Sequence, residues 1–113
     1  MGLFSKLQFS EAKDKLLADL EGLQYEIVDE NVSFIAVKLP FEKNDRYLKI
    51  TLSSFKSGKV VVDVYDSFYI LHIPRREFKD SVEFRKFICD MLATIWHSPW
   101  KISKDKEKSY GLF

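Results

Sequence analysis

Two neighbouring segments of the chain carry aromatic and cationic side chains at alternating positions. Tyr47, Lys49 and Thr51 alternate through the first segment, and Lys59 and Tyr65 lie in the second. Side chains two residues apart in a β-strand lie on the same face of a sheet. Aromatic rings can stack on the bases of a single-stranded nucleic acid, and lysines can contact its phosphates. We therefore expect this face to bind a single strand rather than to catalyse a reaction.

The intervening positions of both segments are apolar, as a half-buried sheet requires. They are Leu48, Ile50, Leu52, Val60, Val62 and Val64. The two segments are thus predicted to form strands with one face in the core. One alternative stays open, which is that the N-terminal helix or a second subunit covers the polar and aromatic face.

Further aromatic and cationic candidates for binding flank these strands. They are Phe55, Lys56, Phe68, Arg75 and Arg76. Residues 46–79 hold seven Lys or Arg against three Asp or Glu, whereas residues 1–45 hold five against nine. This asymmetry indicates an electrostatic surface directed at an anionic partner. The alternative is an ordinary distribution of surface lysines around loops.

Hydrophobic spacing predicts a single α+β domain over residues 1–100. A helix capped by Ser10 is expected to run to about Leu20, with an apolar stripe on one side. A second, amphipathic helix is predicted over residues 80–96.

Five antiparallel strands are predicted between the two helices. Their ranges are residues 24–29, 32–39, 46–53, 58–65 and 68–73. Pro74 is expected to end the fifth strand, because proline has no amide hydrogen for a strand ladder. Residues 101–113 are expected to form a flexible charged tail that ends in an apolar tetrapeptide.

The residue patterns of common enzyme classes are missing from the sequence. The two histidines, His72 and His97, lack the spacing of a metal site, and the four glycines form no phosphate loop. The single cysteine, Cys89, is expected to pack as a small apolar side chain in the second helix. We expect a non-enzymatic protein with no metal and no cofactor. Without a signal-peptide pattern or a long apolar run, it is expected in the cytoplasm.

The segments RYLKI (46–50), FK (55–56) and GKVVVDVY (58–65) are followed by a short strand and an amphipathic helix. Residues 46–96 thereby resemble the single-stranded-DNA-binding module of the transcriptional positive-cofactor proteins. The resemblance implies a Whirly-like fold and a homodimer whose two sheets form one channel.

Within this resemblance, Phe55, Lys56 and Lys59 match the family's Phe-Lys-Gly-Lys turn, and Phe68 matches an aromatic that stacks on DNA. Tyr65 stands where the family has an arginine. The tail resembles that of replication proteins whose terminal phenylalanine recruits enzymes, which makes Phe113 a candidate partner-binding residue. The alternative for the tail is a disordered end or a strand packed on the domain.

These observations predict a sequence-tolerant single-stranded DNA-binding protein of a bacterium or bacteriophage, acting in replication, recombination or transcription. The alternative function is a protein-binding adaptor, such as a secretion-chaperone-like dimer or a small inhibitor of a host protein. That alternative predicts an exposed apolar groove.

Overall fold

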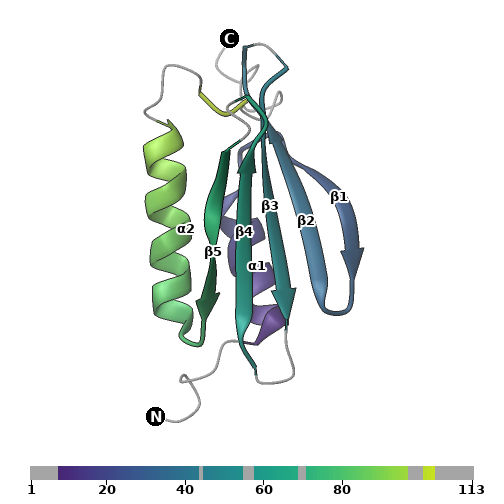
Figure 1. The fold of residues 1–113 in the computed structure, drawn as a ribbon, viewed down its shortest axis with the longest axis vertical. Coiled ribbons are helices and arrows are strands. Elements are labelled where there is room, and N and C mark those ends of the chain that lie inside the picture. The colour runs from purple at the N-terminus through teal and green to yellow at the C-terminus, as the bar shows by residue number, and fades with distance from the viewer. Residues whose placement is uncertain (1–7, 44, 55–57, 69–70, 97–100, 104–113) are drawn as a thin grey trace.

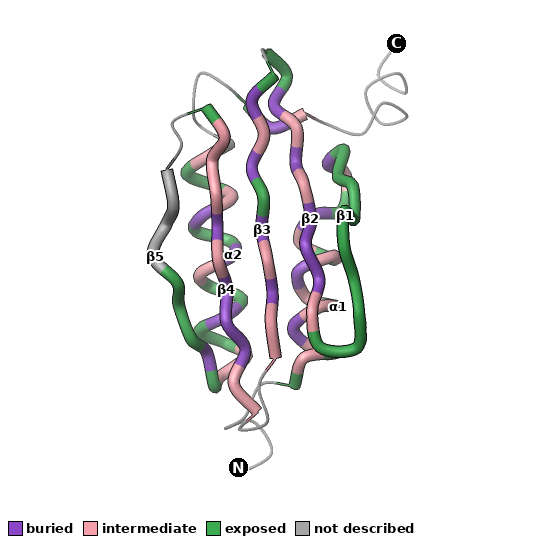
Figure 2. Tube along the Cα trace, turned by 45° about the vertical axis from the view of Figure 1, so that its right-hand side comes forward, coloured by how far each residue is buried: buried purple, intermediate pink, exposed green. Residues whose placement is uncertain are grey.

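The chain folds into an antiparallel sheet with both helices on the same side of it (Figures 1 and 2). The structure is a computed structural model that describes residues 8–43, 45–54, 58–68, 71–96 and 101–103. Its elements are α1 (Phe9–Asp19), β1 (Glu26–Asn31), β2 (Phe34–Pro40), β3 (Tyr47–Ser54), β4 (Val60–Asp66), β5 (Leu71–Phe78) and α2 (Ser81–Trp96). The strands pair in chain order, β1-β2-β3-β4-β5. The predicted α+β class and the five antiparallel strands are confirmed.

Helix α1 begins at Phe9, one residue before the predicted cap Ser10. Gln8 occupies the cap position, and its carbonyl oxygen accepts a hydrogen bond from the amide of Ala12. The helix ends before Gly22, whose φ of 90° is accessible to glycine without a Cβ clash. The predicted apolar stripe faces the sheet, where three of its side chains are fully buried: Ala12, Leu16 and Leu20.

Helix α2 starts after Asp80, whose Oδ1 accepts a hydrogen bond of 2.7 Å from the amide of Val82. Asp80 thus caps the helix through its side chain, at the residue where the helix was predicted to begin. Phe84 and Ile88 are fully buried, and Phe87 packs against the same core while staying partly exposed. Neither α1 nor α2 is long and apolar enough to span a membrane, and these are the helices of the described residues.

The β1–β2 hairpin turns at Val32 and Ser33, so the turn predicted at residues 30–31 was wrong by two residues. Strand β1 continues to Asn31, whose Oδ1 accepts a hydrogen bond of 2.9 Å from the amide of Ser33. All six residues of β1 are exposed, whereas most of β2 is buried. The pairing of the two strands is irregular between Ile27 and Asp29. Strand β1 is therefore an outer strand that lies beyond the packed core (Figure 2).

Strand β5 runs through Pro74 to Phe78, so the prediction that Pro74 ends this strand was wrong. The register of the β4–β5 pair shifts between Val62 and Val64, at the level of this proline. Because β5 is an edge strand, a residue without an amide hydrogen is tolerated there, especially at a bulge.

Residues 101–103, which the sequence assigned to the tail, are packed against the domain. Ile102 is fully buried and forms a bridge with Phe41. The Ser103 amide donates to the carbonyl oxygen of Pro40 at 2.7 Å, and its own carbonyl accepts from the amide of Gln24 at 2.9 Å. The packed chain thus extends to at least residue 103. Phe113 lies outside the described residues.

The two faces of the sheet differ as the alternation in β3 and β4 predicted. The apolar side chains of these strands are at most 1% exposed and lie under the helices: Leu48, Ile50, Leu52, Val60, Val62 and Val64. Helix α1 contributes to that buried core, so the alternative that it covers the polar and aromatic face is excluded. We call the opposite side of the sheet the open face, and its central residues are Lys38, Tyr47, Lys49, Thr51, Asp63 and Tyr65.

Candidate nucleic-acid interface

The two tyrosines of the open face lie next to each other on adjacent strands. Lys49 pairs with Tyr65 across β3 and β4, and Tyr47 is two residues before Lys49 on β3. The ring centroids of Tyr47 and Tyr65 are 6.2 Å apart, and the ring planes are tilted by 53°. Both side chains are partly exposed. Together they form an aromatic platform two strands wide.

Two lysines accompany this platform. The Nζ atom of Lys38 lies 4.5 Å from the centroid of the Tyr47 ring, within the range of a cation–π interaction. Lys38 pairs with Lys49 across β2 and β3, and Lys49 is exposed. Among the described residues, neither lysine takes part in an ion pair.

Lys38 was not among the predicted binding residues. Its signal in the sequence was a single charge inside the apolar strand segment 34–40. The pairing of Lys38 with Lys49 joins two separate strands, so the sequence of one strand alone does not show it.

A small pocket opens beside the platform. Its volume is about 180 Å³, and it is lined by Tyr47, Lys49, Thr51, Asp63 and Tyr65. This volume corresponds to about six water molecules at their liquid volume. Thr51 and Asp63 pair directly across β3 and β4. The pocket therefore joins aromatic, cationic, hydroxyl and carboxylate groups on one side of the sheet.

The Asp63 carboxylate is held by the predicted binding residue Arg75. The Arg75 Nε lies 3.3 Å from Oδ1 and 3.2 Å from Oδ2, and the Nη2 lies 3.1 Å from Oδ2. The side chain of Asp63 is 20% exposed and that of Arg75 is 63% exposed. Arg75 thus adjoins the pocket, but its charge is partly compensated.

Lys59, another predicted binding residue, is also ion-paired, with its Nζ 3.1 Å from Glu77 Oε2. On the outer strand β1, Glu26 pairs with Lys38, and Asp29 pairs with Ala36. Carboxylates therefore flank the platform on both sides. The positive charge available to an anion is concentrated on Lys38 and Lys49.

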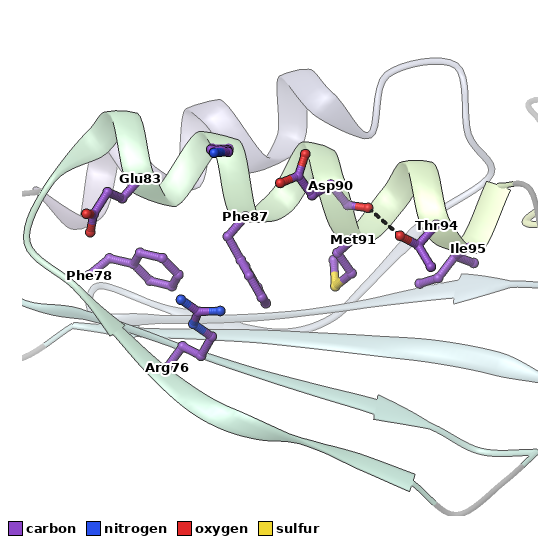
Figure 3. A pocket seen from close by; sticks show the side chains of 9 residues that line it. Arg76, Phe78, Glu83, Phe87, Asp90, Met91, Thr94 and Ile95 are labelled. Carbon is purple, nitrogen blue, oxygen red and sulfur yellow. Dashed lines mark hydrogen bonds between the residues drawn. The ribbon is translucent and has the colours of Figure 1, made fainter.

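Arg76 lies on the side of the sheet that faces α2, away from the other predicted binding residues. It pairs with Val62, an inward-facing residue, and its guanidinium carbon is 4.9 Å from the Phe87 ring centroid and 5.6 Å from that of Phe78 (Figure 3). Consecutive residues of a strand point to opposite faces, so Arg75 and Arg76 cannot both join the open face.

Phe68 lies just beyond the end of β4, and its side chain is 49% exposed. Lys59 lies just before the other end of the same strand, whose seven residues span about 23 Å. Phe55 and Lys56 lie outside the described residues. The structure therefore gathers Tyr47, Lys49 and Tyr65 into one cluster, and it places Lys59 and Phe68 at opposite ends of the sheet.

A second concave surface lies between α2 and β5 (Figure 3). We call it the α2–β5 groove. Its volume is about 640 Å³, and its lining combines apolar and charged side chains: Arg76, Phe78, Glu83, Lys86, Phe87, Asp90, Met91, Thr94 and Ile95. An exposed groove with apolar walls is the feature that the protein-binding alternative predicted.

Cys89 is exposed, so the prediction that it packs in the core was wrong. It follows the buried Ile88 on α2, and its Sγ lies 3.7 Å from Asp19 Oδ2 on α1. Local desolvation, together with the Asp19 carboxylate, raises the pKa of the Cys89 thiol. Within the described ranges, no group of three or more His, Cys, Asp or Glu side chains could hold a metal ion.

Comparison of the chain with protein-family models, with curated proteins and with solved structures found no match.

Proposed function

We propose that this protein binds single-stranded nucleic acid, and DNA in particular, on the open face of its sheet. The observation that carries the proposal is the Tyr47–Tyr65 platform with Lys38 and Lys49 beside it. Bases stack on the rings, and phosphates lie against the two lysines. The protein acts without enzymatic chemistry in replication, recombination or transcription in a bacterial or phage-infected cytoplasm.

Stacking supplies the larger share of the affinity. Each base on an aromatic side chain contributes about 1–3 kcal/mol. The electrostatic share is small, because Lys59 and Arg75 already have carboxylate partners. With two phosphate contacts, the logarithm of the binding constant should fall with the logarithm of salt at a slope of about −1.4. Binding is thus expected to be moderate and only mildly salt-dependent.

Fluorescence anisotropy of a labelled single-stranded oligonucleotide, compared with the matched duplex, tests the proposal. Titrations at about 50 and 200 mM salt give the slope. We expect the single strand to bind more tightly than the duplex, because only unpaired bases expose their faces for stacking. Tyr65→Ala should weaken this binding by about 1–3 kcal/mol. Equal binding of both forms, or none, would refute the proposal.

The Whirly-like assignment and the homodimer are parts of the same proposal. Their support is an antiparallel sheet followed by an amphipathic helix, in the order that the resemblance implies. Phe87 and Ile95 lie in the α2–β5 groove with partly exposed side chains, which gives a second copy an apolar surface to cover. Symmetric dimers are the commonest oligomers.

A second candidate function, the binding of a different protein as an adaptor or inhibitor, is favoured by the same groove. Light scattering after size-exclusion chromatography separates the two uses of this surface. If the wild-type chain is a dimer and the Phe87→Asp variant is a monomer, the groove is the contact surface for a second copy. A wild-type monomer would leave the groove to another protein and would remove the homodimer from the proposal.

A further inference from the structure

The open-face pocket beside Tyr47 and Tyr65 has polar groups that stacking alone does not require. Asp63 and Thr51 line it from the middle of β4 and β3, and Lys49 lines it two pairs further along the ladder. We infer that this pocket holds the Watson–Crick edge of one base that carries an exocyclic amine beside a ring acceptor, which is cytosine or adenine. The inference rests on the proposed function, and it adds a base preference to it.

The volume of the pocket is sufficient for one base. At about 180 Å³ it is below the range of about 300–1,000 Å³ that is typical of pockets for larger ligands. The choice among the bases therefore depends on the polar groups that line the pocket.

The carboxylate of Asp63 decides among the bases. Arg75 donates to both of its oxygens. An ionised carboxylate has about four acceptor sites and no donor, so it can still accept a further hydrogen bond. The exocyclic amine of cytosine or adenine donates such a bond. Thymine and uracil present a carbonyl oxygen at that position, and two acceptors facing each other repel.

Lys49 complements the carboxylate. It pairs with Tyr65, while Asp63 pairs with Thr51, so Lys49 and Asp63 are diagonal neighbours on adjacent strands. Such neighbours have Cβ atoms roughly 7–8 Å apart, which long side chains can span. A lysine donates and never accepts. The pocket therefore offers an acceptor and a donor near each other, which matches the amine and the adjacent ring acceptor of cytosine and adenine.

The test compares short oligo-dC and oligo-dT strands by fluorescence anisotropy, with the full chain at neutral pH and constant salt. We expect the wild-type protein to bind oligo-dC at least about fivefold more tightly than oligo-dT. This factor is the lower end of the discrimination that one specific base contact provides. Asp63→Asn should abolish this preference, because an amide offers both a donor and an acceptor. The matched control is Glu77→Gln, which removes an ion-paired carboxylate of the same strand pair outside the pocket and should keep the preference.

The possible outcomes separate this inference from the proposed function. Equal binding of oligo-dC and oligo-dT would overturn the amine-specific pocket and leave single-strand binding in place. A preference that survives Asp63→Asn would also overturn the assignment to this carboxylate. Absence of binding to either strand would refute both. Circular dichroism of Asp63→Asn shows whether the variant keeps its fold.

Discussion

The Arg46 guanidinium donates to both carboxylate oxygens of Asp66, with Nη2 2.6 Å from Oδ2 and Nε 3.2 Å from Oδ1. Arg46 immediately precedes β3, and Asp66 is the last residue of β4. Their side chains are only 6% and 15% exposed. The guanidinium carbon also lies 4.0 Å from the centroid of the Phe41 ring. One arginine thus connects the end of β4 to the start of β3 and to the segment after β2.

Asp66→Asn should lower the free energy of unfolding by about 3 kcal/mol. Removing one partner of a buried ion pair leaves the other charge uncompensated, which is far more costly than losing a surface pair. Urea unfolding followed by circular dichroism measures the change. Asp45→Asn is the matched control, since Asp45 is exposed one residue before Arg46 and should change stability by less than about 0.5 kcal/mol. Equal effects of the two substitutions would contradict the structural role of the pair.

Ile102→Ala should destabilise the fold by about 2–4 kcal/mol, because it removes a fully buried side chain that bridges to Phe41. The neighbouring Lys101 is exposed, so Lys101→Ala should have almost no effect. Thermal unfolding of both variants provides the comparison. If Ile102→Ala were as stable as the wild type, residues 101–103 would not belong to the packed domain.

Lys49→Ala should make the salt dependence of single-strand binding shallower by about 0.7 in the log–log slope, the share of one phosphate contact on a single strand. Lys86→Ala removes an exposed lysine from α2, on the other side of the sheet, and should leave the slope unchanged. Anisotropy titrations at several salt concentrations measure both slopes. If both variants reduced the salt slope equally, the nucleic acid would bind elsewhere on the protein or bind non-specifically.

The Cys89 thiol should react slowly with iodoacetamide even though it is exposed. Its pKa is raised by local desolvation and by the Asp19 carboxylate, so a smaller fraction is thiolate at mildly alkaline pH than in a free cysteine. Asp19→Asn should lower this pKa and speed alkylation, because the remaining neighbour Arg85 favours the thiolate. Mass spectrometry over a range of pH gives the rates. The alkylation rate of Cys89 in the urea-unfolded chain serves as the reference. An equal rate in the native protein would contradict the prediction that the fold raises the pKa of this thiol.

Local periodicity in the sequence was sufficient to predict the helices, the number of strands and the two faces of β3 and β4. Alternation is a property of neighbouring residues, so Leu48 and Lys49 were assigned to opposite faces correctly. Local periodicity could not predict whether Pro74 ends β5 or lies within it, because a proline inside a strand is tolerated only at an edge or a bulge. Which strand is at the edge is decided by the pairing of the whole sheet.

The candidate site was predicted only in part, for a similar reason. Tyr47 and Tyr65 lie on strands that are consecutive in the sequence and pair as antiparallel neighbours, and their proximity follows from this pairing. The contact of Lys38 with Tyr47 joins a third strand, and Ile102 reaches Phe41 across sixty residues of sequence. The exposed position of Cys89 depends on where α1 ends. Such contacts are set by tertiary packing, which no sequence window contains.

The outer strands of the sheet differ from its centre in a way that bears on aggregation. Strand β1 exposes three acidic side chains, Glu26, Asp29 and Glu30, and strand β5 contains a proline at an irregular pairing. Negative charge, proline and bulges all discourage a further strand from adding to a sheet. A chain with an uncovered, partly aromatic sheet face would otherwise be at risk of forming fibrils. These outer strands should allow the protein to be concentrated without stacking edge to edge.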